Sequence, residues 1–126
     1  MTLRTPLGQV RGLGSARHGV SHWWAQRLSA LALLPLGLWF ALAMIGLAGA
    51  DHAGAAAWAG RPHVAVALTL LIAALCYHLK LGVQVVIEDY VAHKGWRLAA
   101  LIANGAFAIV LAAVAWFAVA SLAFGS

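Results

Sequence analysis

Three long apolar runs dominate this chain of 126 residues and restrict its fold more than any other feature. They cover residues 24–50, 63–87 and 96–124, and each reaches the about 20 residues that cross a hydrocarbon core ~30 Å thick. Hydrophobic residues make up 64% of the chain and charged residues only 9%, which is too little polar surface for a soluble globule. We therefore expect an all-α membrane protein with three transmembrane helices.

The connections between the runs are short, which predicts an up-down-up bundle. A β-barrel would need short alternating strands, and the sequence contains none. The hydrophobic part of a signal peptide is only about 7–15 residues, so the first run is interpreted as a retained span. We expect a basic tail at residues 1–23 and a transmembrane anchor domain at 24–124. Three helices enclose little interior, so the bundle is expected to pack against a partner anchor subunit.

The basic residues predict how the chain is oriented. They gather in the N-terminal tail and in the second connection, at Arg4, Arg11, Arg17, Arg27, Lys94 and Arg97. By the positive-inside rule, the N-terminus and the second connection face the cytoplasm. Glycines at positions 8, 12, 14 and 19 would break the amphipathic helix of a transit peptide, which favours a bacterial inner membrane over a mitochondrial one. The net charge of +5 is scattered, so no nucleic-acid partner is expected.

His78 lies in the middle of the second run, where an ionisable group costs several kcal/mol unless something pairs with it. Ala74 and Gly82 lie one turn away on either side, and such small neighbours allow a flat group to approach the helix. Imidazole is a standard axial ligand of haem iron. The alternative is a histidine hydrogen-bonded to a neighbouring helix or to water. A bis-histidine haem would need its second ligand from another chain, because His78 is the only histidine at mid-membrane depth.

A second group of candidate residues lies near the predicted cytoplasmic surface. If the second helix continues through Tyr90, this residue lies about 18 Å along the helix from His78, and Asp89 shares nearly the same face as His78. Arg27 is placed at the cytoplasmic end of the first span, where it could pair with an anionic group. The alternatives are an aromatic-belt role for Tyr90, a solvated helix end for Asp89, and interfacial anchoring for Arg27.

These residues carry a resemblance to a known family. The segment HLKLGVQVVIEDY from His78 to Tyr90 has the pattern H-x3-G-x-Q-x4-D-Y and resembles the second helix of the small hydrophobic membrane anchor of succinate dehydrogenase. The segment GSARHGVSHWWAQR at residues 14–27 is similar to the region before the first span in that family. Ser21 shifts His22 by one position from the histidine that often follows the Gly-Val pair, so no role is carried over to His22.

The resemblance implies a shared haem and a quinone site. In that family the hydrophobic anchor pairs with a second anchor subunit, cytochrome b556, and the pair holds an iron–sulfur subunit and a flavoprotein subunit at the membrane. Haem b lies between the two anchors. The resemblance assigns one axial ligand to His78 and the other to cytochrome b556, and it places Arg27 near the haem propionates. It also implies that Tyr90 donates a hydrogen bond to a ubiquinone carbonyl, with Asp89 nearby.

The resulting hypothesis is an electron-transfer anchor of respiratory complex II. The chain would be non-catalytic alone but would help to bind haem b and ubiquinone and to pass electrons from succinate oxidation to quinone. The alternative is a haem-free structural anchor of a related fumarate reductase or of another membrane complex. A self-contained cytochrome b is disfavoured because it needs two deep axial ligands for each haem, and only His78 qualifies.

Overall fold

A computed structural model describes residues 5, 7 and 16–125 of the chain. Four helices are labelled, namely α2 (Ala16–Gly46), α3 (His52–Ala59), α4 (Pro62–Tyr90) and α5 (Lys94–Phe124). The described residues contain no β-strand, and α2, α4 and α5 are long and apolar enough to cross a membrane. The predicted all-α fold with three long apolar helices is therefore confirmed.

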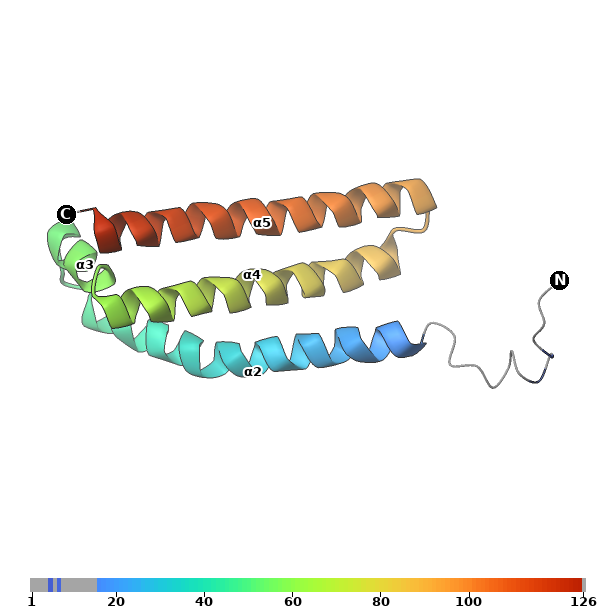
Figure 1. The fold of residues 1–126 in the computed structure, drawn as a ribbon, viewed down its shortest axis with the longest axis horizontal. Coiled ribbons are helices and arrows are strands. Elements are labelled where there is room, and N and C mark those ends of the chain that lie inside the picture. The colour runs from blue at the N-terminus through green and yellow to red at the C-terminus, as the bar shows by residue number, and fades with distance from the viewer. Residues whose placement is uncertain (1–4, 6, 8–15, 126) are drawn as a thin grey trace.

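The three long helices lie side by side and alternate in direction, with α4 in the middle (Figure 1). Helix α4 packs against α2 on one side and α5 on the other, whereas α2 and α5 make no contact over the described residues. The up-down-up order is as expected, but the helices form a row. The start of α2, the end of α4 and the start of α5 lie at one end of the molecule, and α3 lies at the other (Figure 1).

The bounds of the helices differ from those of the apolar runs. Helix α2 begins at Ala16 rather than at the expected Trp24, and it ends at Gly46 rather than at Ala50. Helix α4 continues through Tyr90, which meets the condition for placing Asp89 and His78 on nearly the same face. Hydropathy shows where the apolar residues begin and end. The bounds of a helix depend on its backbone hydrogen bonds, which can continue through polar residues.

The short helix α3 was not predicted from the sequence. The side chain of Asp51 caps its N-terminus by accepting a hydrogen bond from the Gly54 N–H at 2.8 Å. The helix packs against α4 and α5. Its Trp58 ring also stacks on Trp39 of α2, with 5.9 Å between centroids and 24° between planes. Helix α3 therefore contacts all three long helices at this end of the row.

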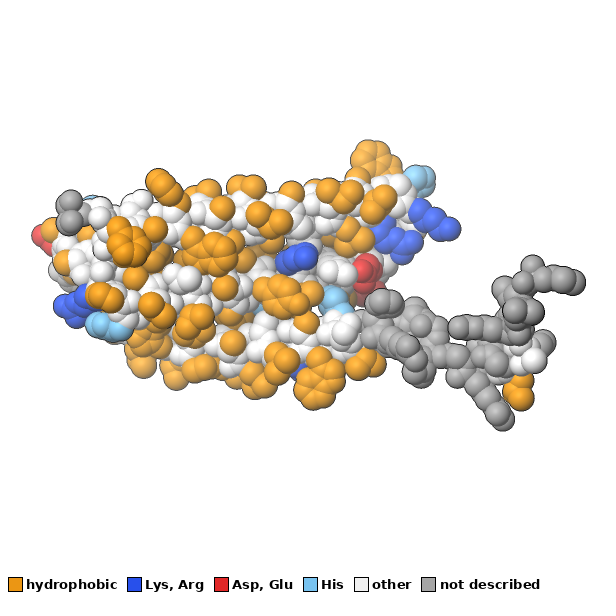
Figure 2. Space-filling view, in the orientation of Figure 1, with side chains coloured by type: hydrophobic (Ala, Val, Ile, Leu, Met, Phe, Trp, Pro, Cys, Tyr) orange, Lys and Arg blue, Asp and Glu red, His pale blue; other side chains and the backbone are white. Residues whose placement is uncertain are grey.

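The buried seam runs along the central helix. Val64, Leu68 and Leu71 are buried at helical spacing on α4. Large apolar side chains elsewhere on the long helices are mostly exposed, and they cover the visible face of the molecule (Figure 2). In a single row of helices both faces remain open, so lipid or a partner chain must cover this surface.

Candidate functional site

His78 faces α2 and contacts two of its polar side chains. Its Nδ1 atom lies 3.0 Å from Ser29 Oγ, and its Nε2 atom lies 3.4 Å from Gln26 Nε2. The Ser29 hydroxyl also donates a hydrogen bond to the backbone carbonyl of Gln26 at 3.0 Å. One imidazole on α4 is thus held by two residues that are three positions apart on α2, one turn of that helix.

This cluster is the most polar part of the helix interfaces. Ser29 is 8% exposed and is the one buried polar side chain in the described part of the chain. Two further buried atoms, Gln26 Oε1 and His22 Nε2, have no hydrogen-bond partner among the described residues. Unpaired buried polar atoms are costly, so this region has hydrogen-bonding capacity that the described chain leaves unused.

A hollow near His78 is lined by four small and two large side chains. An open hollow of about 580 Å³ lies between α2 and α4, lined by Ala25, Leu28, Ser29, Ala73, Ala74 and Tyr77. Ala74 therefore lines the hollow beside His78, as its spacing suggested. Gly82 faces Gln26 instead, and a methyl group added at Gly82 would lie an ordinary 3.7 Å from Gln26 Nε2.

The other predicted site residues are all exposed. Arg27 is exposed, and its guanidinium carbon lies 5.3 Å from the centroid of the Trp23 ring. Asp89 is exposed near the end of α4, and Tyr90, the last residue of the helix, is 83% exposed. Arg27 lies at the level of His78, because its neighbours Gln26 and Ser29 contact that residue, whereas Asp89 and Tyr90 lie at the end of α4. The described chain alone does not bring the four residues into one site.

Sequence reasoning missed Ser29 and Gln26. A signal was present, because the two residues form a polar pair, three positions apart, in a helix that is otherwise mostly apolar. Polar side chains within a membrane helix usually face another helix. Their partner could not be chosen from the sequence, because that choice depends on how α2 and α4 align.

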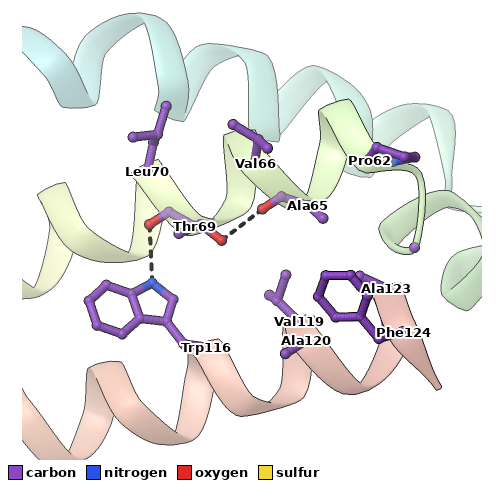
Figure 3. A pocket seen from close by; sticks show the side chains of 11 residues that line it. Pro62, Ala65, Val66, Thr69, Leu70, Trp116, Val119, Ala120, Ala123 and Phe124 are labelled. Atoms are coloured by element: carbon purple, nitrogen blue, oxygen red, sulfur yellow. Dashed lines mark hydrogen bonds between the residues drawn. The ribbon is translucent and has the colours of Figure 1, made fainter.

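A second hollow lies between α4 and α5, near α3. It has a volume of about 460 Å³ and is lined mainly by apolar side chains, among them Val66, Leu70, Val119 and Phe124. The Trp116 indole N–H donates a hydrogen bond to the backbone carbonyl of Thr69 at 3.2 Å at its edge (Figure 3). No ionisable side chain lines this hollow, and none of the predicted site residues reaches it.

The described part of the chain assembles no multidentate site for a free metal ion. Over the residues that the structure describes, no three His, Cys, Asp or Glu side chains come close enough to hold one. A haem requires less of the protein, because the porphyrin supplies four of the iron ligands and the protein only the axial ones. The site is thus a single available imidazole near a hollow lined by four small and two large side chains.

The helices define the class of this protein. Three helices long and apolar enough to cross a bilayer, on a chain with few charged residues, make it a multi-pass membrane protein. Residues 1–119 match the family described as "Succinate dehydrogenase/Fumarate reductase transmembrane subunit", and the chain belongs to this family of membrane anchor subunits. The resemblance inferred from the sequence pattern is therefore confirmed.

Two relatives cover most of the chain. It is similar to the succinate dehydrogenase hydrophobic membrane anchor subunit of Paracoccus denitrificans, with 33% identity over 122 residues, 97% of this chain and 94% of the relative. The protein of the same name from Rickettsia bellii (strain RML369-C) is 32% identical over 108 residues, 85% of this chain and 86% of the relative. No solved structure shows a significant match to this chain.

Proposed function

We propose that this chain binds haem b and ubiquinone as an anchor subunit of succinate dehydrogenase and helps to pass electrons from succinate oxidation to quinone. The observation that carries the proposal is the position of His78, a half-buried imidazole near the middle of an apolar helix. Its Nδ1 atom is held by Ser29, whereas its Nε2 atom has only the long 3.4 Å contact with Gln26. Nε2 is therefore the atom available to a ligand.

The residues around His78 fit a haem. Four of the six residues that line the nearby hollow have small side chains. The buried Gln26 Oε1 atom has no partner among the described residues, so no hydrogen bond to this oxygen holds the Gln26 amide in place. Bound between His78 and a histidine of the second anchor subunit, haem b would supply a one-electron redox centre with no open iron position. The role of His78 is to donate the Nε2 lone pair and to orient the imidazole.

Arg27 is placed to contact an anionic group of a ligand bound near His78. It follows Gln26 directly on α2, and the guanidinium lies over Trp23 without an ion pair in the described part of the chain. A guanidinium forms strong, often bidentate hydrogen bonds with carboxylates. We assign Arg27 to a haem propionate, with interfacial anchoring beside Trp23 as its role when no haem is bound.

Tyr90 and Asp89 form the quinone end of the proposed site. Tyr90 lies about 18 Å along α4 from His78, and its phenol is open to a ligand because the side chain is 83% exposed. The phenol O–H donates a hydrogen bond to a quinone carbonyl, which gains negative charge during reduction. Asp89, one residue earlier, is assigned to proton relay toward that carbonyl.

The proposed partners follow from the orientation of the chain in the membrane. The end of the row that contains Tyr90 would face the cytoplasm of a bacterial cell, because Lys94 and Arg97 lie in or beside the connection at that end. The iron–sulfur and flavoprotein subunits would dock there, close to the quinone. The second anchor, cytochrome b556, would cover the face of the row that opens onto the hollow beside His78.

One observation favours a second function, a haem-free structural anchor. Both ring nitrogens of His78 already have contacts within the chain, to Ser29 and to Gln26. A histidine satisfied in this way could simply join α2 to α4. The two functions differ in one measurable property, the presence of a low-spin haem whose spectrum depends on His78.

The test is the visible spectrum of the purified complex carrying His78→Leu. The proposal expects loss or a marked shift of the low-spin haem bands, with part of the quinone reduction retained. His63→Leu is the matched control, because His63 is exposed at the start of the same helix, far from the site, and it should leave the spectrum unchanged. A wild-type complex without haem, or an unchanged spectrum in His78→Leu, would contradict the assignment.

A further inference from the structure

Ser29 has a hydrogen-bond geometry that favours one of the two neutral tautomers of His78. The Ser29 hydroxyl is 3.0 Å from the backbone carbonyl of Gln26 and 3.0 Å from His78 Nδ1. A hydroxyl has one hydrogen to donate, and a carbonyl can only accept. With that hydrogen directed to the carbonyl, a lone pair of Oγ is left to accept a hydrogen bond from a protonated Nδ1 of His78.

The contact with Gln26 agrees with this assignment. Its amide nitrogen carries only hydrogens, so at 3.4 Å from His78 Nε2 it faces a lone pair rather than an N–H. The opposite tautomer would require two changes at once. The Gln26 amide would have to turn over to present its oxygen, and the Ser29 hydroxyl would have to leave the Gln26 carbonyl.

We infer that Ser29 is a positioning residue that holds His78 in the Nδ1-protonated tautomer, so that the Nε2 lone pair is directed toward the iron. Gln26 covers Nε2 when no iron is bound and moves aside when it is. The statement about the tautomer rests on the geometry alone, whereas the statement about the iron rests on the proposed function. A hydrogen bond from the far nitrogen of a ligating histidine fixes the ring and makes the ligating nitrogen more basic.

The burial of Ser29 supports a specific role. At 8% exposed, it is the most enclosed polar side chain among the described residues, and its hydroxyl would cost free energy at this position if it were unpaired. Ser121 on α5 provides the contrast. Its hydroxyl also donates to the carbonyl of an earlier residue in its own helix, Phe117, at 2.8 Å, but it is exposed and contacts no histidine.

The first experiment measures the tautomer without haem. Nitrogen-15 NMR of the complex with labelled histidine, purified from cells unable to make haem, distinguishes a protonated ring nitrogen from an unprotonated one. His78→Leu identifies the signal of His78. We expect a protonated Nδ1 in the wild type and in Ser29→Thr, which keeps the hydroxyl, and a mixture of tautomers in Ser29→Ala. A protonated Nε2 in the wild type would overturn the inference.

The second experiment measures the haem. Loss of the hydrogen bond makes the ligating nitrogen less basic, so Ser29→Ala should weaken haem retention about 10–100-fold and raise the midpoint potential. Each tenfold loss of preference for ferric iron corresponds to about 59 mV in a one-electron couple. Ser29→Thr and Ser121→Ala should leave both properties unchanged.

The results separate the two proposals. If His78→Leu abolishes the haem spectrum but Ser29→Ala behaves like Ser29→Thr in potential and retention, His78 remains the ligand and the role of Ser29 is wrong. If the wild-type complex contains no haem, the proposed function fails, and the NMR result alone decides whether Ser29 sets the tautomer of His78.

Discussion

The side-chain amide of Asn104 donates a hydrogen bond to the backbone carbonyl of Lys80 at 2.9 Å, and this bond joins the middle of α5 to the middle of α4. Asn104 and Lys80 are both half-buried. At the far end of the same interface, Trp116 makes a similar bond to the carbonyl of Thr69. Two side chains of α5 therefore hold the backbone of α4 in register.

We expect Asn104→Leu to weaken the packing of α5 on α4. Hydrogen bonds between membrane helices contribute about 0.6 kcal/mol on average and at most about 1.7 kcal/mol. The free energy of unfolding should therefore decrease by about 0.6–1.7 kcal/mol. Unfolding of the purified complex in a detergent titration measures it. Ile102→Leu, at an exposed position two residues away, is the control. Equal stability of the two variants would mean that the bond contributes nothing.

We expect Gly60→Ala to disturb the contact between the α3–α4 connection and the end of α5. A methyl group at Gly60 would lie 2.6 Å from the Leu122 carbonyl oxygen, so the backbone must shift, at a cost of about 1–3 kcal/mol. Gly105→Ala is the matched control, because a methyl group there meets no atom within 4 Å. Detergent unfolding should show a lower free energy of unfolding for Gly60→Ala only. Equal free energies of unfolding for Gly60→Ala and Gly105→Ala would contradict this prediction.

The phenol of Tyr90 can be tested apart from the haem. Tyr90→Phe removes only the hydroxyl, so assembly and the haem spectrum should persist while succinate:quinone activity falls. Loss of one preorganised donor costs on the order of 10²-fold in rate. Succinate oxidation with an artificial acceptor that takes electrons at the flavin should be unchanged.

Trp96→Phe is the control for an interfacial aromatic role, since Trp96 is 72% exposed at the start of α5, at the same end of the molecule. Near-normal quinone turnover and inhibitor sensitivity in Tyr90→Phe would assign Tyr90 to the aromatic belt instead.

The orientation in the membrane is a separate prediction. Reporter fusions at Ser126 and next to Asp51 should both read as external, and a fusion at His93 should read as cytoplasmic. The reason is the excess of Arg and Lys in the N-terminal tail and the second connection. A cytoplasmic signal at Ser126 would contradict the predicted orientation or the predicted number of spans.

Several features of this protein followed from the sequence because they depend on local chemistry. Long apolar runs predicted three spanning helices, and their short connections predicted alternating directions. The position of His78 near the middle of a long apolar helix followed from its place within one run. The H-x3-G-x-Q-x4-D-Y pattern, carried by the single helix α4, pointed to the family that the comparison confirmed. Each of these inferences uses residues close together in the chain.

Other features depend on contacts between helices. The pairing of His78 with Ser29 joins residues 49 positions apart, and it exists because α2 and α4 pack in one particular register. Helix α2 is apolar around most of its circumference, so its sequence pattern does not say which side faces α4. The row arrangement and the packing of α3 depend on the same contacts. The sequence therefore determined which groups enter the membrane, and only the packing of the helices decided which of them meet.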